Sequence, residues 1–362
     1  MTSLGTIGRL SRAIGIGLLV ACSAAAWADE GPHPTFDERM VLLTADIDAG
    51  KFKQIHSLLV YQGGEVAFER YFKGNDDWID FKGGIKRIRG EGDVQWHANR
   101  QHYMASVTKT VTALLTGIAL EELKLSVDAR LEPLLPPELK PLLQQDAGYL
   151  TLKHLLTMQT GFQWDEWTGD DLREVWKTDD FGKFLLKRTN LGPEAPWVYN
   201  SAVPNLLLRT LEHQLAQPLG TWANERFFGP LGITNYTWHR QPTGTPEGSA
   251  RLHLTPNDML KIGAMMMSGG KYEGEQVVPP AWLDAMTRKH CGSDAGDYGY
   301  LTWLRELDGR PYISADGDGG QYINIFPHEE VIVVMTQGNY LEWPLYANQA
   351  TMIMRDYIFN KP

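Results

Sequence analysis

The sequence predicts a protein of the α/β class, of the α+β type, in which both ends of the chain build one sheet. The first observation is a pair of strand-like segments at 57–62 and 65–72, separated by two glycines. The second is a similar pair near the other end, at 322–326 and 331–335. The third is that the patterns between these pairs are mainly helical. We therefore expect a sheet domain, a separate helical lobe, and a site in the cleft between them.

The N-terminal 28 residues resemble a signal peptide. Arg9 and Arg12 precede the apolar run 13–21, and Ala26-Trp27-Ala28 supplies the small residues that a signal peptidase requires. The apolar run is too short for a stable membrane span. We expect cleavage after Ala28 and export to the bacterial periplasm or cell envelope. An alternative is a lipoprotein, because Leu19-Val20-Ala21-Cys22 is similar to a lipobox in which Cys22 would carry a lipid anchor.

The composition excludes several classes of function. The 362 residues carry a net charge of −10, and loss of Arg9 and Arg12 leaves 32 basic against 44 acidic residues. Such an acidic protein is a poor partner for nucleic acid or for an anionic membrane. After cleavage Cys291 would be the only cysteine, so no internal disulfide is expected. Close clusters of metal-ligating residues do not occur in the sequence, and we expect no metal and no cofactor.

The remaining elements follow in chain order. The segment from Lys73 to Arg100 is rich in glycine and charge and has no sustained period. We interpret it as an insertion loop, a solvated excursion in preference to a lid. Helical patterns then occupy 106–120, 150–158, 205–212, 255–263 and 346–357, with Thr255 as N-cap and Pro256 as first residue of the fourth helix. The predicted domains are 29–124 with 256–362 for the sheet and 125–255 for the helical lobe.

The tetrapeptide Ser106-Val107-Thr108-Lys109 carries the chemistry that we expect. It opens an apolar helix and places a hydroxyl and an amine one turn apart on the same face. A desolvated lysine at this spacing can accept the serine proton during attack on a carbonyl. The same pattern recurs at Ser268-Gly269-Gly270-Lys271, but in a glycine turn that aims neither side chain. We therefore expect only the first serine to be a nucleophile.

A serine–lysine pair requires a third group that passes a proton to the leaving group, and a tyrosine drawn toward phenolate by the lysine suits this role. The candidates, each in a Tyr-x-Asn/Ser triplet, are Tyr199, Tyr322 and Tyr346. The last two are expected in a strand and a helix with structural roles. Tyr199 follows Glu194-Ala195-Pro196-Trp197-Val198, in a loop of the helical lobe that can face the cleft. We expect Tyr199 to be the proton shuttle.

The glycine-rich segment Ala315-Asp316-Gly317-Asp318-Gly319-Gly320-Gln321 leads into a strand across the expected cleft. Its glycines would let the backbone approach a substrate closely. The oxyanion would lie between the N–H of Ser106 and one N–H of this segment. Asp318 is the first choice for that donor and Gln321 the second.

With Ser106, Lys109, Tyr199 and this glycine edge in order, the chain resembles the penicillin-recognising serine hydrolases that carry an SxxK motif. It is most similar to the class C β-lactamase-related esterases and amidases, in particular the 6-aminohexanoate-dimer hydrolase branch. The segments 155–162 and 229–233 and Gly319-Gly320-Gln321 add to the resemblance. It implies a β-lactamase/transpeptidase-like fold, a mainly antiparallel sheet flanked by helices with an all-helical lobe, and the roles of nucleophile, base and shuttle already given.

Two positions depart from the family pattern. The second motif ends in Ser201 where asparagine is usual, so its substrate contact comes from Ser201, from Asn200 or from neither. The third motif has Ala315-Asp316-Gly317 where penicillin-binding members carry lysine or histidine. An acid there would repel a substrate carboxylate, and we expect poor β-lactamase activity.

These observations together predict an exported serine hydrolase that acts on small esters or amides through an acyl-enzyme on Ser106. The alternatives are a β-lactamase or D,D-peptidase that acts on cell-wall peptides, and a catalytically silent protein that binds a ligand in the cleft. Intact Ser106, Lys109 and Tyr199 oppose the silent protein, because a sensor requires none of them.

Overall fold

The computed structural model describes residues 34–81, 85–167 and 170–360. The predicted signal peptide, its cleavage after Ala28 and the alternative lipid anchor at Cys22 lie outside the described residues. The chain from Phe36 onward forms one compact unit, and the predicted division into a sheet domain and a lobe stays a prediction. None of the helices within the described ranges is long and apolar enough to cross a membrane.

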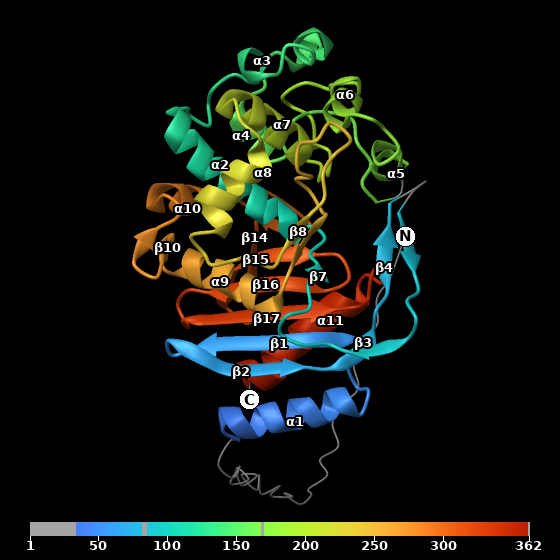
Figure 1. Ribbon diagram of the computed structural model, residues 1–362, viewed down its shortest axis with the longest axis vertical. Coiled ribbons are helices and arrows are strands. Elements are labelled where there is room, and N and C mark those ends of the chain that lie inside the picture. Colours follow the sequence, from blue (N-terminus) through green and yellow to red (C-terminus); the bar gives the residue numbers. More distant parts are fainter. Residues whose placement is uncertain (1–33, 82–84, 168–169, 361–362) are drawn as a thin grey trace, which may run out of the picture. The chain divides into compact units, whose positions relative to one another are not determined.

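A large antiparallel sheet is the centre of the fold (Figure 1). Among the described residues it has eight strands in the order β12-β13-β14-β15-β16-β17-β1-β2. Their bounds are β1 Ile55–Gln62, β2 Glu65–Tyr71, β12 Cys291–Ser293, β13 Gly296–Tyr298, β14 Trp303–Leu307, β15 Arg310–Gly317, β16 Gln321–Phe326 and β17 Val331–Gln337.

Both predicted hairpins are confirmed. Strand β1 pairs with β2 with Ser57 opposite Tyr71, and β16 pairs with β17 with Phe326 opposite Val331. The two hairpins also join each other, because β1 lies antiparallel to β17 with Leu58 opposite Met335. The two ends of the chain thus build one sheet, as the sequence predicts.

Strands begin earlier in the C-terminal part than we expected, since β12 to β15 precede the predicted hairpin. The turn between β14 and β15 is Asp308-Gly309, with φ values of 50° and 81°, and Leu307 pairs with Arg310 across it. Two left-handed residues between paired strands make the tight hairpin that Asp-Gly favours. This signal was present in the sequence, and the charges at 305 and 306 hid the strand pattern.

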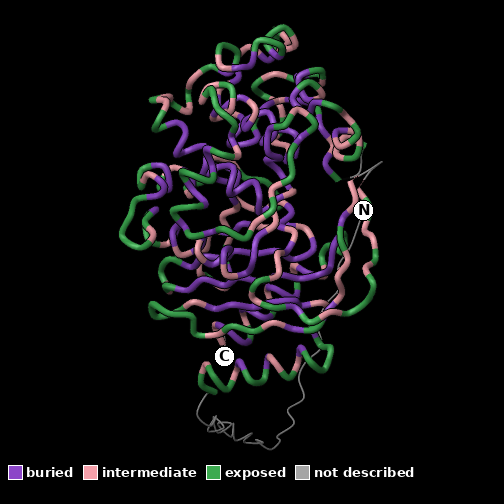
Figure 2. The backbone as a smooth tube through the Cα atoms, viewed as in Figure 1, coloured by how far each residue is buried: buried purple, intermediate pink, exposed green. Residues whose placement is uncertain are grey.

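Helices cover both faces of the sheet, because its central strands are apolar on both sides. Leu58, Val333 and Met335 face α1 (Phe36–Asp48) and α11 (Leu345–Met352), which continues as a π-helical turn over Ile353–Ile358. Leu59 and Val334 face the other layer, which includes α2 (Val107–Leu123) and α9 (Pro256–Met267). Figure 2 shows the central strands and α2 as buried and much of α1 as exposed.

Helix α2 is buried at every position from Val107 to Leu120. A helix that is buried on all sides requires cover all round: the sheet supplies one side, and α7 (Val203–Leu215) and α10 (Pro280–Met286) supply others. In Figure 1 the helical lobe lies on the side of α2 that faces away from the sheet. Its other helices are α3 Leu131–Leu134, α4 Leu152–Leu156, α5 Asp171–Val175, α6 Phe181–Leu186 and α8 Leu219–Ala223, with 3-10 turns at Lys140–Leu142 and Gln145–Ala147 and a π-helical turn at Asn224–Phe228.

The predicted all-helical lobe also contains strands. β8 (Thr237–Trp238) and β9 (Leu252–Leu254) pair with each other, and β9 pairs with β7 (His102–Tyr103) directly before Ser106. The Met104 N–H donates to the Leu252 carbonyl at 3.0 Å. This pairing holds the chain that leads into β9 next to the start of α2.

The segment 73–100 is more ordered than the expected loop. It forms two short antiparallel pairs, β3 (Lys73–Asn75) with β6 (Asp93–Gln95) and β4 (Trp78–Asp80) with β5 (Lys86–Ile88). A final short pair, β10 (Lys271–Tyr272) with β11 (Glu275–Gln276), follows α9. Three-residue strands carry too few alternations to register as strand patterns, which is why the sequence did not reveal them.

Candidate active site

A cleft of about 810 Å³ contains the predicted catalytic serine. Its walls come from the sheet, from the helical lobe and from the segment 73–100. Aromatic side chains dominate them: Phe81, Tyr103, Trp167, Trp176, Trp197, Tyr199, Trp303, Tyr322, Trp343 and Tyr346. Ile79, Phe81 and Ile85 belong to the segment that we interpreted as a solvated excursion. That interpretation was wrong, because these apolar side chains form one wall of the cleft.

Ser106 and Lys109 lie together at the start of α2. Ser106 occupies the N-cap position, and Lys109 Nζ donates a hydrogen bond of 2.8 Å to its Oγ. The preceding residue, Ala105, has φ 45°, a left-handed conformation that is strained for alanine. This turn directs the chain sharply into the helix at the serine. By contrast, Ser268 ends α9, and Gly269 and Gly270 follow it in a turn, as expected.

Lys109 is almost completely buried, with 1% of its surface exposed. Burial lowers the pKa of Lys109 from 10.5 to about 8, and the carboxylates Glu166 and Glu247 oppose this shift. The amine also donates to the Ser249 carbonyl at 3.0 Å. Near neutral pH an appreciable fraction of Lys109 is therefore uncharged and able to accept a proton.

The Ser249 carbonyl is held in place by two buried residues that the sequence analysis missed. Glu247 accepts hydrogen bonds from the N–H groups of Ser249, Ala250 and Arg251, at 2.8, 2.8 and 2.6 Å. Asn205 donates to Ser249 Oγ at 3.1 Å and accepts from the Gly248 N–H at 2.9 Å. These contacts position the carbonyl that receives Lys109. No spacing rule joins positions 205 and 247, so only the folded chain reveals them.

Tyr199 is the tyrosine beside the nucleophile. Ser106 lies close enough to its hydroxyl to lower the pKa of the phenol, and Lys109 Nζ lies 4.9 Å from the centre of its ring. The ring lies between Trp167 and Trp303, at centroid distances of 5.9 and 5.8 Å and interplanar angles of 20° and 15°. Tyr322 and Tyr346 also line the cleft, but the Tyr346 hydroxyl donates to Asp318 at 3.2 Å.

The pKa of Tyr199 differs from our expectation. Burial raises it above its ordinary value, the interaction with Ser106 opposes this, and Glu166 and Asp316 add to the rise. The phenol consequently stays protonated at neutral pH and is not drawn toward phenolate. It can donate a proton, whereas Lys109 is the group able to accept one.

The glycine edge lies directly against the turn that carries Ser106. A Cβ on Gly317 would stand 2.3 Å from the Met104 carbonyl oxygen and 3.2 Å from Ala105 Cβ, so only glycine permits this approach. Asp318 follows it and lines the cleft. Over the described chain, neither the Ser106 N–H nor the Asp318 N–H has a hydrogen-bond acceptor. Both donors are available to an oxyanion.

Gln321 lies elsewhere. Its side chain is fully buried in β16, does not line the cleft, and donates to the Gln337 carbonyl at 2.8 Å. Its position supports the turn and not a substrate contact. Asp318 is therefore the better placed of the two residues that we selected for the second oxyanion donor.

Ser201 lines the cleft, whereas Asn200 is buried and does not. The Ser201 hydroxyl and N–H both donate to Glu166, at 2.5 and 3.0 Å, and Trp164 Nε1 donates to the same carboxylate at 2.7 Å. Glu166 is a cleft residue that the sequence analysis missed, because it lies in an irregular segment without a motif. It holds Ser201 and places a negative charge near Lys109.

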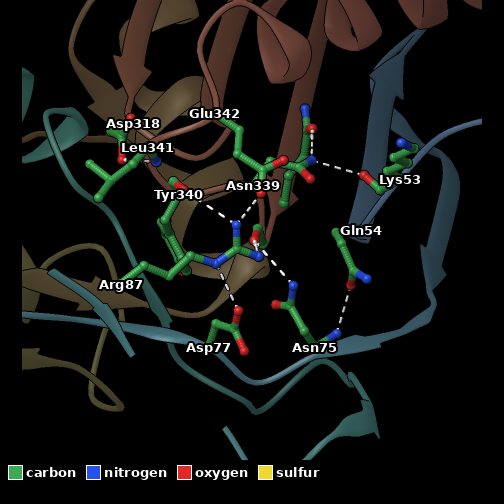
Figure 3. A network of polar contacts seen from close by, with 12 residues as sticks. Lys53, Gln54, Asn75, Asp77, Arg87, Asp318, Asn339, Tyr340, Leu341 and Glu342 are labelled. Carbon is green, nitrogen blue, oxygen red and sulfur yellow. Dashed lines mark hydrogen bonds and ion pairs between the residues drawn. The ribbon is translucent and has the colours of Figure 1, made fainter. Parts of the chain in front are cut away.

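A charged network fixes the opposite wall (Figure 3). Arg87 of β5 donates to Asp77 at 2.7 Å and to the Gly338 carbonyl at 3.2 Å, and forms an ion pair with Glu342. The Leu341 N–H in the same loop donates to Asp318 at 3.0 Å. Arg87 thereby ties the 73–100 segment to the loop that carries the cleft residues Leu341 and Trp343.

Comparison with protein families matches residues 54–350 to the family described as Beta-lactamase. The match spans most of the chain and includes Ser106, Lys109 and Tyr199. The chain belongs to the beta-lactamase family. The proteins of this family and its structural neighbours are serine hydrolases of the β-lactamase, esterase and amidase type. No curated protein sequence matches the chain.

Solved structures share the fold at low sequence identity. A candidate 6-aminohexanoate-dimer hydrolase from Bacillus anthracis has a TM-score of 0.68 at 18% identity, over 89% of this chain and 83% of that chain. EstCE1, a hydrolase with promiscuous acyltransferase activity, has a TM-score of 0.62 at 17% identity, over 87% of this chain and 98% of that chain. A class C beta lactamase from Rhodobacter sphaeroides has a TM-score of 0.62 at 15% identity, over 89% of this chain and 99% of that chain. These likenesses confirm the β-lactamase/transpeptidase-like fold that the resemblance implied.

Proposed function

We propose that this beta-lactamase-family protein is an exported hydrolase that cleaves small, uncharged esters or amides through an acyl-enzyme on Ser106. One observation carries the proposal: Lys109 Nζ donates to Ser106 Oγ and lies 4.9 Å from the centre of the Tyr199 ring, within an aromatic cleft of about 810 Å³. A nucleophile, a base and a proton donor are then in mutual contact, which a silent binding protein would not require.

Acylation uses the three groups in turn. Uncharged Lys109 takes the proton of Ser106 as Oγ forms a bond with the carbonyl carbon, and the carbonyl electron pair moves onto oxygen. The N–H groups of Ser106 and Asp318 stabilise this oxyanion, and single donors of this kind are worth roughly 10²–10³ in rate. The oxyanion collapses and the leaving group departs with the phenolic proton of Tyr199. Lys109 then returns a proton to the phenolate.

Deacylation repeats this sequence with water. Lys109, again uncharged, removes a proton from the attacking water through Tyr199, and a second oxyanion forms at the same donors. Its collapse breaks the bond between Oγ and the acyl carbon, and Ser106 recovers its proton. The products are the carboxylic acid and the free enzyme.

The lining of the cleft supports uncharged, apolar substrates. Aromatic rings bury substrate surface at about 25 cal/mol per Å², and Trp167 and Trp343 at its mouth are 78% and 69% exposed. The acids Glu166, Asp316 and Asp318 line the same cleft. They disfavour a substrate carboxylate, which supports an ester or amide over a penicillin. Export rests on the signal-peptide features of residues 1–28.

A substrate panel tests the proposal. Purified protein, Ser106→Ala and Ser268→Ala are incubated with short-chain aryl esters, linear amides, a chromogenic cephalosporin and a D-Ala-D-Ala peptide. Ser268 is the matched control because it starts the second SxxK pattern and lies exposed in a turn. We expect ester or amide turnover that Ser106→Ala abolishes and Ser268→Ala retains. Efficient cephalosporin or peptide cleavage would favour the cell-wall alternative, and no turnover of any substrate would favour a binding protein.

A further inference from the structure

The strongest observation that the proposed mechanism does not use is an ion pair in the cleft wall. Arg305 of β14 and Asp316 of β15 both line the cleft. Arg305 donates to Asp316 Oδ2 twice, from Nε at 2.9 Å and from Nη2 at 2.5 Å. Its Nη1 donates to the Ala295 carbonyl at 3.0 Å, and Ser314 Oγ donates to the other oxygen of Asp316. One edge of the guanidinium is thus held entirely by one carboxylate oxygen.

This ion pair lies next to the catalytic groups. Arg305 Cζ is 4.7 Å from the centre of the Trp303 ring, and Trp303 stacks on Tyr199. The charges act on the tyrosine as well, since Asp316 raises the pKa of Tyr199 and Arg305 lowers it. Arg305 and Asp316 therefore line the part of the cleft next to Tyr199, where a bound substrate can reach them.

The pair is largely withdrawn from solvent, with 26% and 19% of the two side chains exposed. Screening is weaker here than at an open surface, so each charge matters more for a bound substrate. A guanidinium is also the side chain best shaped to bind a carboxylate through two parallel hydrogen bonds. The cleft thus contains a carboxylate-binding group whose binding edge an internal carboxylate already occupies.

We propose that Asp316 is a specificity-determining residue that keeps substrate carboxylates away from Arg305, so that the cleft accepts uncharged substrates. An uncharged residue at 316 would free Arg305 to bind a substrate carboxylate. This inference rests on the proposed hydrolase function. In this explanation Asp316 competes with a substrate carboxylate for Arg305, whereas in the simpler explanation Asp316 only repels that carboxylate. The two explanations predict different results when Asp316 and Arg305 are both replaced.

The experiment compares kcat/KM for neutral and anionic esters in matched pairs. One pair is p-nitrophenyl butyrate and the p-nitrophenyl monoester of succinate, with the carboxylate on the acyl group. The other is phenyl acetate and 4-acetoxybenzoate, with the carboxylate on the leaving group. Wild type, Asp316→Asn, Arg305→Gln and the double variant are measured. Asp297→Asn is the matched control, because Asp297 lies on neighbouring β13, pairs with Lys289 and does not line the cleft.

We expect Asp316→Asn to raise the anionic-to-neutral ratio at least about tenfold in one pair, the scale of a gained charge contact of about 1.4 kcal/mol. The double variant should lose this gain, and Asp297→Asn should leave the ratio within about twofold of wild type. An unchanged ratio in both pairs would overturn the proposal. An equal rise in the double variant would also overturn it, because Arg305 would then play no part.

Two further measurements keep the test independent of folding and of the proposed function. If Asp316→Asn fails to fold, Asp316→Ser is used, and competitive inhibition of neutral-ester turnover by benzoate is compared with wild type. Inhibition should strengthen about tenfold in the variant, and unchanged inhibition would contradict the proposal. Failure of the hydrolase function itself would appear differently, as absence of Ser106-dependent turnover of neutral esters in the wild type.

Discussion

Lys109 Nζ lies 2.8 Å from Ser106 Oγ, and both side chains project from the first turn of the same buried helix. Only 1% of the lysine surface is exposed, and its other hydrogen bond is to the carbonyl of Ser249. A buried amine against a hydroxyl is a costly arrangement unless the amine is uncharged for part of the time. The same contact therefore governs activity, stability and their dependence on pH.

Replacement of Lys109 by methionine should abolish activity and stabilise the protein at pH 7. Loss of the base should lower kcat/KM at least about 10³-fold. The pKa of Lys109 falls from 10.5 to about 8 on folding, so burying the charge costs about 3 kcal/mol below pH 8. The variant avoids this cost but loses the hydrogen bonds of Lys109. We expect its free energy of unfolding in urea at pH 7 to exceed that of wild type by roughly 1–2 kcal/mol.

The pH dependence of that gain has a definite sign. The pKa of Lys109 is lowered on folding, so the wild type becomes more stable as pH rises from about 8 to 10.5. The advantage of Lys109→Met over wild type should therefore shrink across this window. A constant difference, or one that grows with pH, would contradict the assignment of a lowered pKa to Lys109.

Activity should rise with pH along a limb centred near pH 8. The uncharged amine is the base, and the pKa of Lys109 is about 8. The profile of kcat/KM for a neutral aryl ester measures this limb directly. A profile already flat from pH 6 upward would show that Lys109 is not the titrating base.

Glu166→Gln should move this limb to lower pH. The Glu166 carboxylate raises the pKa of Lys109, as does Glu247, and removal of its charge lets burial lower that pKa further. We expect a shift of roughly half a unit to one unit. Glu138→Gln is the matched control, because Glu138 is an exposed acid that pairs with Arg209. The same midpoint of the rising limb of kcat/KM in both variants would show that Glu166 does not act on the base.

Arg87→Ala should loosen the wall formed by the 73–100 segment. The change leaves Asp77, whose side chain is 9% exposed, without its ion pair and frees the loop that contains Leu341. We expect the free energy of unfolding to fall by about 1–3 kcal/mol and the segment to be cleaved faster by proteases. The exposed Arg89, two residues away, supplies the control variant Arg89→Ala. Equal proteolysis rates in the two variants would contradict the role of Arg87.

Gly317→Ala should impair catalysis by separating the oxyanion donors. The added Cβ would meet the Met104 carbonyl at 2.3 Å, so the end of β15 must move away from Ser106. The loss of one donor costs roughly 10²–10³ in kcat. Circular dichroism checks that the variant is folded. Wild-type kcat in a folded variant would exclude this edge from the oxyanion site.

Much of the fold follows from local sequence patterns. The hairpins β1–β2 and β16–β17 carry runs of apolar residues around glycine or acidic turns, and α9 carries its Thr255 cap and Pro256 start. These signals are contained within about ten residues of chain. The strands of 73–100 carry no such signal, because each is only three residues long and β5, with two charged residues, is held by distant partners such as Gly338.

The candidate site divides in the same way. Ser106 and Lys109 are one helical turn apart, so their contact is fixed by local geometry. Glu166, Asn205 and Glu247 reach the site only through the tertiary fold, and their types are common throughout the chain. Arg305 faces Asp316 because β14 pairs with β15. Recognising the Asp308-Gly309 turn would have placed these two strands together from sequence.

Detection of an acyl-enzyme tests the central claim most directly. Protein quenched in acid during turnover of an aryl ester is analysed by mass spectrometry, intact and after proteolysis, beside Ser106→Ala. We predict a mass increase equal to the acyl group on the peptide that contains Ser106, and no adduct on the variant. An adduct on another residue, or wild-type turnover by Ser106→Ala, would contradict the account.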